Sequence, residues 1–157
     1  MKRQTALFLF LLATAAVNAQ SRSSALSIEL GKNGLLYNLT YDHKLSNYGL
    51  RVVTGHNLAR YLRAFVAGGG GYYLAGRGVR FLELGADLYY LRITELSDDQ
   101  VSFTFIHPSA PASTLYPSAN IGYRSYGDRT LFRIGFSPGI IKQEFIPGGY
   151  LSIGVLL

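Results

Sequence analysis

The chain has 157 residues, with 12 Tyr, 9 Phe and 18 Gly, no Cys and no Trp, and a formal net charge of +6. The length suits one domain, and the absence of Cys excludes a disulfide framework and any thiolate metal site. The basic residues are scattered singly, which argues against a nucleic-acid surface, so we expect no nucleic-acid partner.

The N-terminal segment predicts a secretory signal peptide. A basic start, MKR, precedes an apolar run over residues 6–17 that is too short to span a bilayer as a helix. The run ends in a small-x-small cleavage pattern at Ala19. We therefore expect residues 1–19 to be removed and residues 20–157 to form the one domain; an N-terminal anchor is the alternative. After this segment no apolar run reaches the length of a membrane helix, so a closed β-barrel is the membrane-spanning class that remains.

Eight candidate strands follow, each with the alternation of apolar and polar residues that a strand requires. Their expected ranges are 25–31, 35–45, 48–55, 62–75, 80–93, 116–126, 130–141 and 149–157. In the fifth, RFLELGADLYYLRI, Leu82 and Leu84 lie on one face, whereas Glu83 and Asp87 lie on the other. Either the apolar face is a protein core and the carboxylates meet water, or the apolar face meets lipid and the carboxylates are enclosed.

Turn signals separate these strands in an alternating pattern of lengths. Tight turns are expected at 46–47, 76–78 and 127–128, and longer connections between them, the longest at 95–114. The turn expected at 33–34 is an exception, because it is short but lies at the end of the longer loops. Short turns at one end and longer loops at the other are typical of outer-membrane barrels.

Two of the tight turns also predict a strand register. With Ser46-Asn47 as a two-residue turn, Asp42 lies opposite Arg51 as a cross-strand ion pair. With Gly127-Asp128 as a two-residue turn, Gly122 lies opposite Arg133. Both hairpins then have one apolar face and one charged face, and this agreement supports the strand assignment.

The polar face is rich in Gly and carries charges of both signs, which suits a crowded interior. Eight strands enclose a space just wide enough for side chains, and a buried charge requires a partner, so we expect a filled lumen of ion pairs. In particular, Glu83 should pair with Arg124, Arg133 or both. The predicted lumen network is Asp42, Arg51, Glu83, Asp87, Arg124 and Arg133, with Glu29, Lys44 and Arg63 on the same face.

Three smaller features complete the pattern. Gly68–Gly71 predicts a bent strand in which Gly69 and Gly71 make room for inward Tyr89 or Asp87. His43 and His56 are isolated and lack metal-ligand spacing, so we expect no metal site. The tyrosines with expected outward parity are Tyr37, Tyr41, Tyr48, Tyr72, Tyr90 and Tyr123.

The stretches LLYNLTYDHKL, FLELGADLYYL, SANIGYRSYGDRTLFRIGFSPGI and YLSIGVLL resemble strands of the small outer-membrane β-barrels of Gram-negative bacteria, the OmpA/OmpX-like superfamily. The resemblance covers nearly all of residues 20–157 and rests on alternation and turns. It implies an all-β, eight-stranded antiparallel up-and-down transmembrane barrel in the outer membrane, monomeric and in contact with outer-membrane lipids and lipopolysaccharide. Such barrels are inserted by a dedicated machinery that usually reads a terminal aromatic residue, whereas this chain ends in Leu157.

The expected function is structural, or adhesive and ligand-binding through the external loops, without cofactor or enzymatic activity. One alternative is an outer-membrane enzyme acting on lipid A or phospholipid. His107 and Ser109, with Asp98 or Asp99 as orienter, resemble the Ser–His pair of barrel lipid-A deacylases. A second alternative is a soluble exported barrel of lipocalin type, with an apolar pocket inside and polar residues outside.

Overall fold

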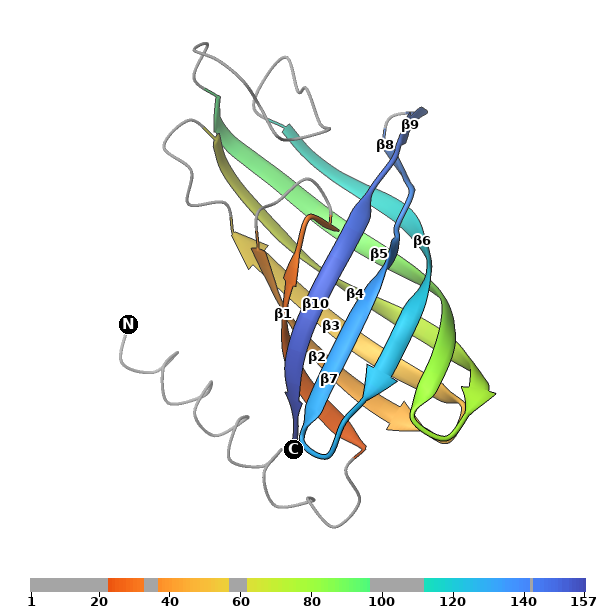
Figure 1. Cartoon of the computed structure of the whole chain (residues 1–157). Helices are drawn as coiled ribbons and strands as arrows, with labels where there is room; N and C mark the ends of the chain where they lie inside the picture. Colours follow the sequence, from red (N-terminus) through yellow and green to blue (C-terminus); the bar gives the residue numbers. More distant parts are fainter. Residues whose placement is uncertain (1–22, 33–36, 57–61, 97–111, 142) are drawn as a thin grey trace, which may run out of the picture.

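The computed structural model describes residues 23–32, 37–56, 62–96, 112–141 and 143–157 (Figure 1). The expected signal peptide, the expected turn at 33–34 and the catalytic candidates His107, Ser109, Asp98 and Asp99 lie outside the described residues. In the part of the chain that is described, no helix is both long enough and apolar enough to cross a membrane.

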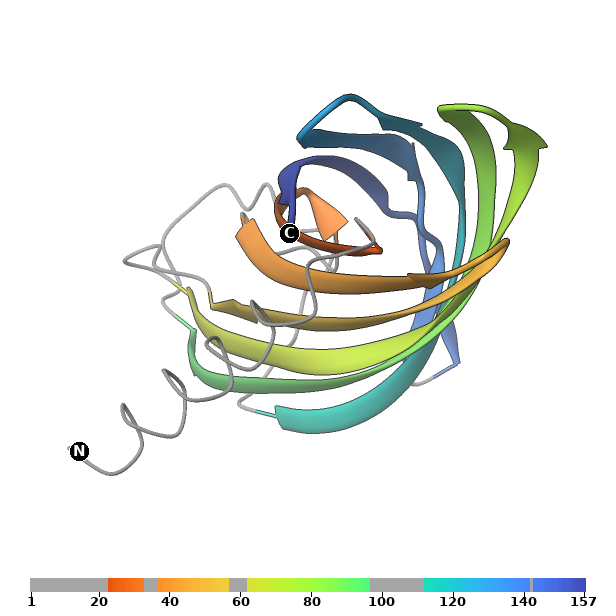
Figure 2. The same ribbon diagram turned by 90° about the horizontal axis from the view of Figure 1, so that it is seen from below.

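The described residues form one antiparallel sheet of ten strands in the order β5-β4-β3-β2-β1-β10-β7-β6-β8-β9, closed by pairing of β5 with β6. The strands are β1 Ser24–Leu30, β2 Tyr37–Leu45, β3 Tyr48–His56, β4 Leu62–Arg77, β5 Arg80–Leu96, β6 Ala112–Tyr126, β7 Thr130–Phe136, β8 Gly139–Ile141, β9 Glu144–Ile146 and β10 Gly149–Leu156. Figure 2 shows the strands curving around the barrel axis.

Ten strands make an eight-stranded barrel because β8 prolongs β7 and β9 prolongs β10. The interruption falls at Ser137-Pro138, where proline has no N–H to give to the ladder. Ser137 N still donates to Gly148 O at 2.6 Å. The pairing of Gly139 with Ile146 keeps the register that β7 and β10 share. The expected strand at 130–141 is therefore one wall strand with a break, and the eight-stranded prediction is confirmed.

The register fixes the tilt of the strands. Following paired residues once around the barrel from Phe81 leads back to β5 at Leu91, ten residues farther on. The partners on the way are Arg124, Arg133, Ser152, Glu29, Asn38, Gly55 and Val66. With a rise of about 3.3 Å per residue and about 4.8 Å between strands, this stagger gives a tilt of about 40°.

The two ends of the barrel differ. The β2–β3, β4–β5 and β6–β7 turns lie together at one end with the C-terminus (Figure 1), and we call this the turn end. The strand ends that lead into residues 33–36, 57–61 and 97–111 lie at the other end, which we call the loop end. The expected connection at 95–114 is shorter than predicted, because β5 continues to Leu96 and β6 begins at Ala112.

The predicted register is confirmed at one hairpin and wrong at another. Asp42 lies opposite Arg51, as Ser46-Asn47 requires. In the β6–β7 hairpin, however, Arg133 lies opposite Arg124 and not Gly122. Gly127 N donates to Thr130 O at 2.8 Å, so the turn residues are 128–129, one position later than expected. The β4–β5 turn is also later, because Arg77 pairs with Arg80.

Apolar side chains close the lumen near both ends. At the turn end, Tyr72, Leu74 and Phe81 pack together with Tyr126. Toward the loop end a larger cluster lies inside the tall wall made by β4, β5 and β6. It consists of Val53, Ala64, Val66, Tyr89, Leu91, Ile93, Tyr116 and Ile141, with Ile146 against it. The charged side chains occupy the region between these clusters.

Candidate functional site: the charged lumen network

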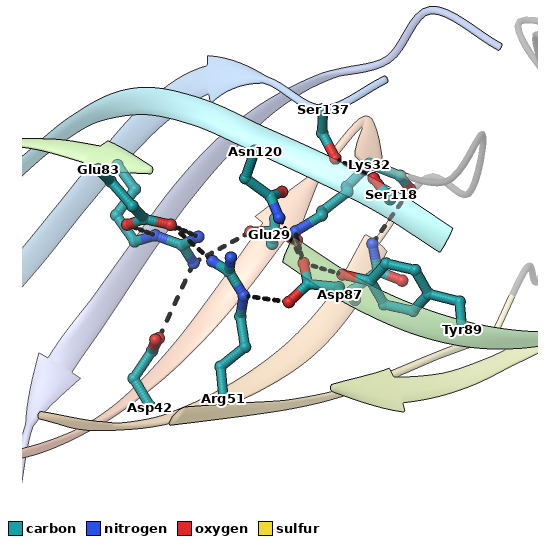
Figure 3. A network of polar contacts seen from close by, with 12 residues as sticks. Glu29, Lys32, Asp42, Arg51, Glu83, Asp87, Tyr89, Ser118, Asn120 and Ser137 are labelled. Carbon is teal, nitrogen blue, oxygen red and sulfur yellow. Dashed lines mark hydrogen bonds and ion pairs between the residues drawn. The ribbon is translucent and has the colours of Figure 1, made fainter. Parts of the chain in front are cut away.

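The structure brings all six predicted network residues together inside the barrel, with two further members, Glu29 and Lys32. Figure 3 labels Glu29, Lys32, Asp42, Arg51, Glu83 and Asp87 among them. They come from β1, β2, β3, β5, β6 and β7 and from the segment after β1. The most exposed of the eight, Asp87, keeps 4% of its surface accessible. Strand alternation explains this placement, because each residue in a strand has the inward parity opposite to its exposed apolar neighbours.

Glu83 is the centre of the network, since its carboxylate meets three guanidinium groups. Arg124 Nε donates to Glu83 Oε2 at 2.6 Å, and Arg51 donates to Oε1 at 2.7 Å. Arg133 donates to both oxygens, at 3.1 and 2.8 Å. The carboxylate thus lies between Arg124 and Arg133, which are directly opposite each other on β6 and β7. It neutralises a cross-strand pair of like charges that would otherwise repel.

Asp87 organises the half of the network nearer the loop end (Figure 3). Arg51 Nε lies 2.9 Å from Asp87 Oδ1. On Oδ2 it accepts from Lys32 Nζ at 2.9 Å, Asn120 Nδ2 at 2.7 Å and the Tyr89 hydroxyl at 2.7 Å. Because Arg51 contacts both Glu83 and Asp87, it joins the two halves into one network.

Asp42 receives its cation from across the lumen, whereas Glu29 receives its cation from the same wall, on the far side of β10. Arg124 lies 3.0 Å from Asp42, and Arg133 lies 3.1 Å from Glu29. The expected ion pair between Asp42 and Arg51 is therefore wrong as to partner, although the register that suggested it is right. The guanidinium of Arg51 extends instead to the carboxylates of β5.

The network is balanced in charge. Lys32, Arg51, Arg124 and Arg133 supply four positive charges, and Glu29, Asp42, Glu83 and Asp87 supply four negative charges. A buried ion repays its desolvation when it is paired and hydrogen-bonded. Equal numbers of the two signs let every one of these ions meet an opposite charge.

Aromatic faces cover the guanidinium groups. Arg124 lies over the Tyr72 ring at 4.1 Å, and Arg133 lies over the Tyr150 ring at 5.0 Å. The expected outward orientation of Tyr72 is therefore wrong: it is buried and faces the lumen, whereas Tyr73 faces outward. Near the turn end, Lys44 lies between Phe81 and Tyr126.

The glycine run of β4 makes room for this network, but not at the predicted positions. A Cβ on Gly68 would meet the Tyr89 ring at 2.5 Å, and one on Gly70 would meet the Asp87 carboxylate at 2.4 Å. Gly71 faces outward, and its Cβ would meet nothing closer than 3.7 Å. The assignment to Gly69 and Gly71 is thus wrong by one residue, and one residue exchanges the two faces of a strand.

Lys32 is the network member that sequence reasoning missed. Continued strand alternation from Glu29 places residue 32 on the outer face. Gly31 has a φ of 83°, which ends the alternation and lets Lys32 turn into the lumen. The sequence signal was a lysine beside a glycine at the end of an otherwise uncharged outer face. The side chain of Arg63, the remaining residue of the predicted polar face, is not among those described.

Some hydrogen-bonding capacity remains on the wall formed by β10, β1 and β2. Within the described part of the chain, seven buried side-chain oxygens there have no hydrogen-bond partner: Ser27 Oγ, Glu29 Oε1, Asn38 Oδ1, Thr40 Oγ1, Asp42 Oδ2, Tyr150 Oη and Ser152 Oγ. Buried polar atoms of this kind are usually satisfied by water. The described residues include no group of three or more His, Cys, Asp or Glu able to hold a metal ion.

Comparison with known proteins identifies the fold. No family model and no curated protein matches the chain. The structure is similar to the N-terminal β-barrel domain of Pseudomonas aeruginosa OprF, with a TM-score of 0.66, 11% identity, and 87% of this chain and 98% of that one covered. It is also similar to Neisserial surface protein A, with a TM-score of 0.51, 13% identity, and coverages of 84% and 92%. The chain therefore has the fold of the small eight-stranded outer-membrane β-barrels, as the sequence predicted.

Proposed function

We propose that this protein is an integral outer-membrane barrel whose filled lumen has a structural role and whose loop end serves binding or adhesion at the cell surface. The proposal rests on one observation: a belt of exposed apolar side chains surrounds a closed barrel whose lumen holds eight buried charged side chains. Its members include Leu50, Val52, Leu88, Leu115 and Ile153, each more than half exposed.

The belt has the height of a bilayer core. On β5 the outward residues from Leu82 to Tyr90 are uncharged, and Arg80 and Arg92 bracket them. Twelve residues at about 3.3 Å, tilted by about 40°, span about 30 Å along the barrel axis. The hydrocarbon core of a bilayer is about 30 Å thick, so both arginines would lie at its edges.

The sidedness of the barrel favours a membrane over water. A soluble lipocalin-type barrel has an apolar pocket inside and polar residues outside. Here the centre of the lumen holds eight charged side chains, whereas large apolar side chains are exposed on the outer wall. A monomeric soluble protein rarely exposes an apolar surface that continues around the molecule.

The filled lumen supports a structural role over a transport role. Glu83 joins side chains of β3, β6 and β7 across the interior, and Tyr72, Leu74 and Phe81 pack at the turn end. The network would hold the strands in register and stabilise the barrel. The longer connections at the loop end would supply the surface that meets ligands or other cells.

Fractionation and gel mobility test this proposal. We expect the protein in the outer-membrane fraction, extracted by detergent, and migrating faster when it is not boiled, because a closed barrel stays compact until heated. Recovery as a soluble periplasmic protein with one mobility would contradict the proposal.

A further inference from the structure

We propose that Arg77 and Arg80, with the hydroxyl of Ser125, form a binding site on the outer wall for the phosphate of an anionic phospholipid headgroup. The two arginines lie directly opposite each other at the end of the β4–β5 hairpin, and Ser125 is the partner of Arg80 on β6. The inference rests on the membrane placement proposed above.

The pair resembles an arrangement that the barrel itself neutralises elsewhere. Arg124 and Arg133 are also directly opposite each other, inside the lumen, and the Glu83 carboxylate lies between them. Arg77 and Arg80 are exposed, and among the described residues no carboxylate lies within ion-pair distance of either. Like charges directly opposite across two strands destabilise a hairpin. An anion from outside the chain would take the place that Glu83 takes inside.

The position of Arg77 and Arg80 at the edge of the apolar belt indicates that the bound anion is a lipid headgroup. Arg80 lies at the turn-end edge of the apolar belt, next to outward Leu82 and Leu84, which are 47% and 41% exposed. Acyl chains resting on these leucines would place their headgroup beside the two guanidinium groups. The rings of Tyr48 on β3 and Tyr73 on β4 lie with their centroids 5.1 Å apart and their planes tilted by 52°, and both are exposed, as in an interfacial aromatic girdle.

The chemistry of the pair fits a phosphate ester. Each guanidinium presents a planar set of N–H donors that matches two phosphate oxygens. The Ser125 hydroxyl adds one donor from the third strand of the same row. Two positive charges favour a headgroup with net negative charge, such as phosphatidylglycerol, over a zwitterionic one.

The surrounding charge reinforces this preference. The turn end carries Arg77, Arg80 and Arg129 in or beside its described turns, with Asp128 as the acidic residue among them. This excess of positive charge would attract anionic lipid to the leaflet that borders the turn end.

Unfolding in vesicles of defined composition tests the site. The urea midpoint is measured in phosphatidylcholine vesicles, with and without phosphatidylglycerol, for the wild-type chain and for Arg77→Gln/Arg80→Gln. We expect phosphatidylglycerol to raise the wild-type midpoint and the double variant to lose most of that rise. The matched control, Arg129→Gln, removes one exposed charge from the same end and should keep the rise, whereas Arg77→Gln and Arg80→Gln should each lose part of it.

Each other outcome counts against the site. An equal loss in the control would show general charge attraction, and a full rise in Arg77→Gln/Arg80→Gln would place lipid binding elsewhere. If inorganic phosphate added to phosphatidylcholine vesicles gives the same rise, the pair takes free phosphate and not a lipid. If no variant gains heat-dependent gel mobility in vesicles, the membrane placement fails first, and the site fails with it.

Discussion

At the scale of single residues, each buried charge in the lumen is stabilised because it contacts an opposite charge on another strand. Glu83 meets three arginines, and each of those arginines also reaches a second carboxylate: Asp87, Asp42 or Glu29. Removing one charged side chain therefore leaves several buried ions without one of their oppositely charged partners. The cost of breaking a buried pair exceeds the net value of the pair itself.

Glu83→Gln should lower the free energy of unfolding by about 3–5 kcal/mol, because three guanidinium groups would lose their shared anion in a region of low dielectric. The urea midpoint in vesicles measures the change. Glu144→Gln is the control, because Glu144 is exposed on β9 and its substitution should change stability by less than about 0.5 kcal/mol. Equal midpoints for the two variants would mean that the network does not stabilise the barrel.

Sequence parity placed seven of the eight network residues on the inner face, all but Lys32. Glu83 pairs with both Arg124 and Arg133, as predicted. The predicted partner of Asp42, however, is wrong. Parity states which face a side chain takes, and it does so for Asp42 and Arg51 correctly. Ion pairing in the lumen depends on reach across the barrel, which strand neighbours do not determine. Arg124 therefore finds Asp42 on the far wall.

At the scale of elements, the sequence pattern does not distinguish hairpin registers that differ by two residues. Moving the β6–β7 turn by one residue changes the pairing by two, from Gly122 to Arg124 opposite Arg133. Such a shift keeps every side chain on its face, so the apolar pattern does not distinguish the two. A Cβ on Gly122 or Gly135 would meet the Tyr150 hydroxyl at 2.5 or 2.8 Å. The packing of side chains inside the lumen therefore distinguishes the two registers of the β6–β7 hairpin.

Substitutions in the glycine run of β4 test which of its residues face the lumen. Gly70→Ala should destabilise the barrel by about 1–3 kcal/mol or prevent folding, because its Cβ would lie 2.0 Å from Ala86 O and 2.7 Å from Asp87 Cα. Gly71→Ala adds the same atom to the outer face, where the nearest atom is 3.7 Å away. We expect Gly71→Ala to fold with an unchanged or higher urea midpoint. If Gly71→Ala destabilises the barrel and Gly70→Ala does not, the assignment of Gly70 to the inner face is wrong.

At the scale of the whole molecule, the apolar belt and the balanced lumen are complementary parts of one arrangement. The strand alternation that exposes Leu82 and Leu88 also encloses Glu83 and Asp87. The sequence therefore predicted the closed barrel and its inside and outside together. It did not predict the break at Pro138 or the inward turn of Lys32, because both depend on local backbone geometry.

A depth profile of arginine substitutions tests the placement of the belt. Ala86 lies midway between Arg80 and Arg92 on β5, and Leu82 lies near the turn-end edge. In vesicles, Ala86→Arg should cost about 2–4 kcal/mol of unfolding free energy, and Leu82→Arg about 0–1 kcal/mol. Urea midpoints that do not depend on depth would indicate that this face meets water.

The pairing of Arg133 with Glu29 has a consequence for assembly. Arg133 lies on β7, Glu29 lies on β1, and the two strands are joined through β10, which pairs with both. A chain in which β1 and β10 had not yet paired would be an open sheet whose charged face is accessible to water. Pairing of β1 with β10 would then remove water from the eight ions and complete their ion pairs in the same step. We therefore expect no stable folding intermediate with an open barrel. A substitution that weakens the pairing of β1 with β10 should slow barrel closure more than the earlier folding steps.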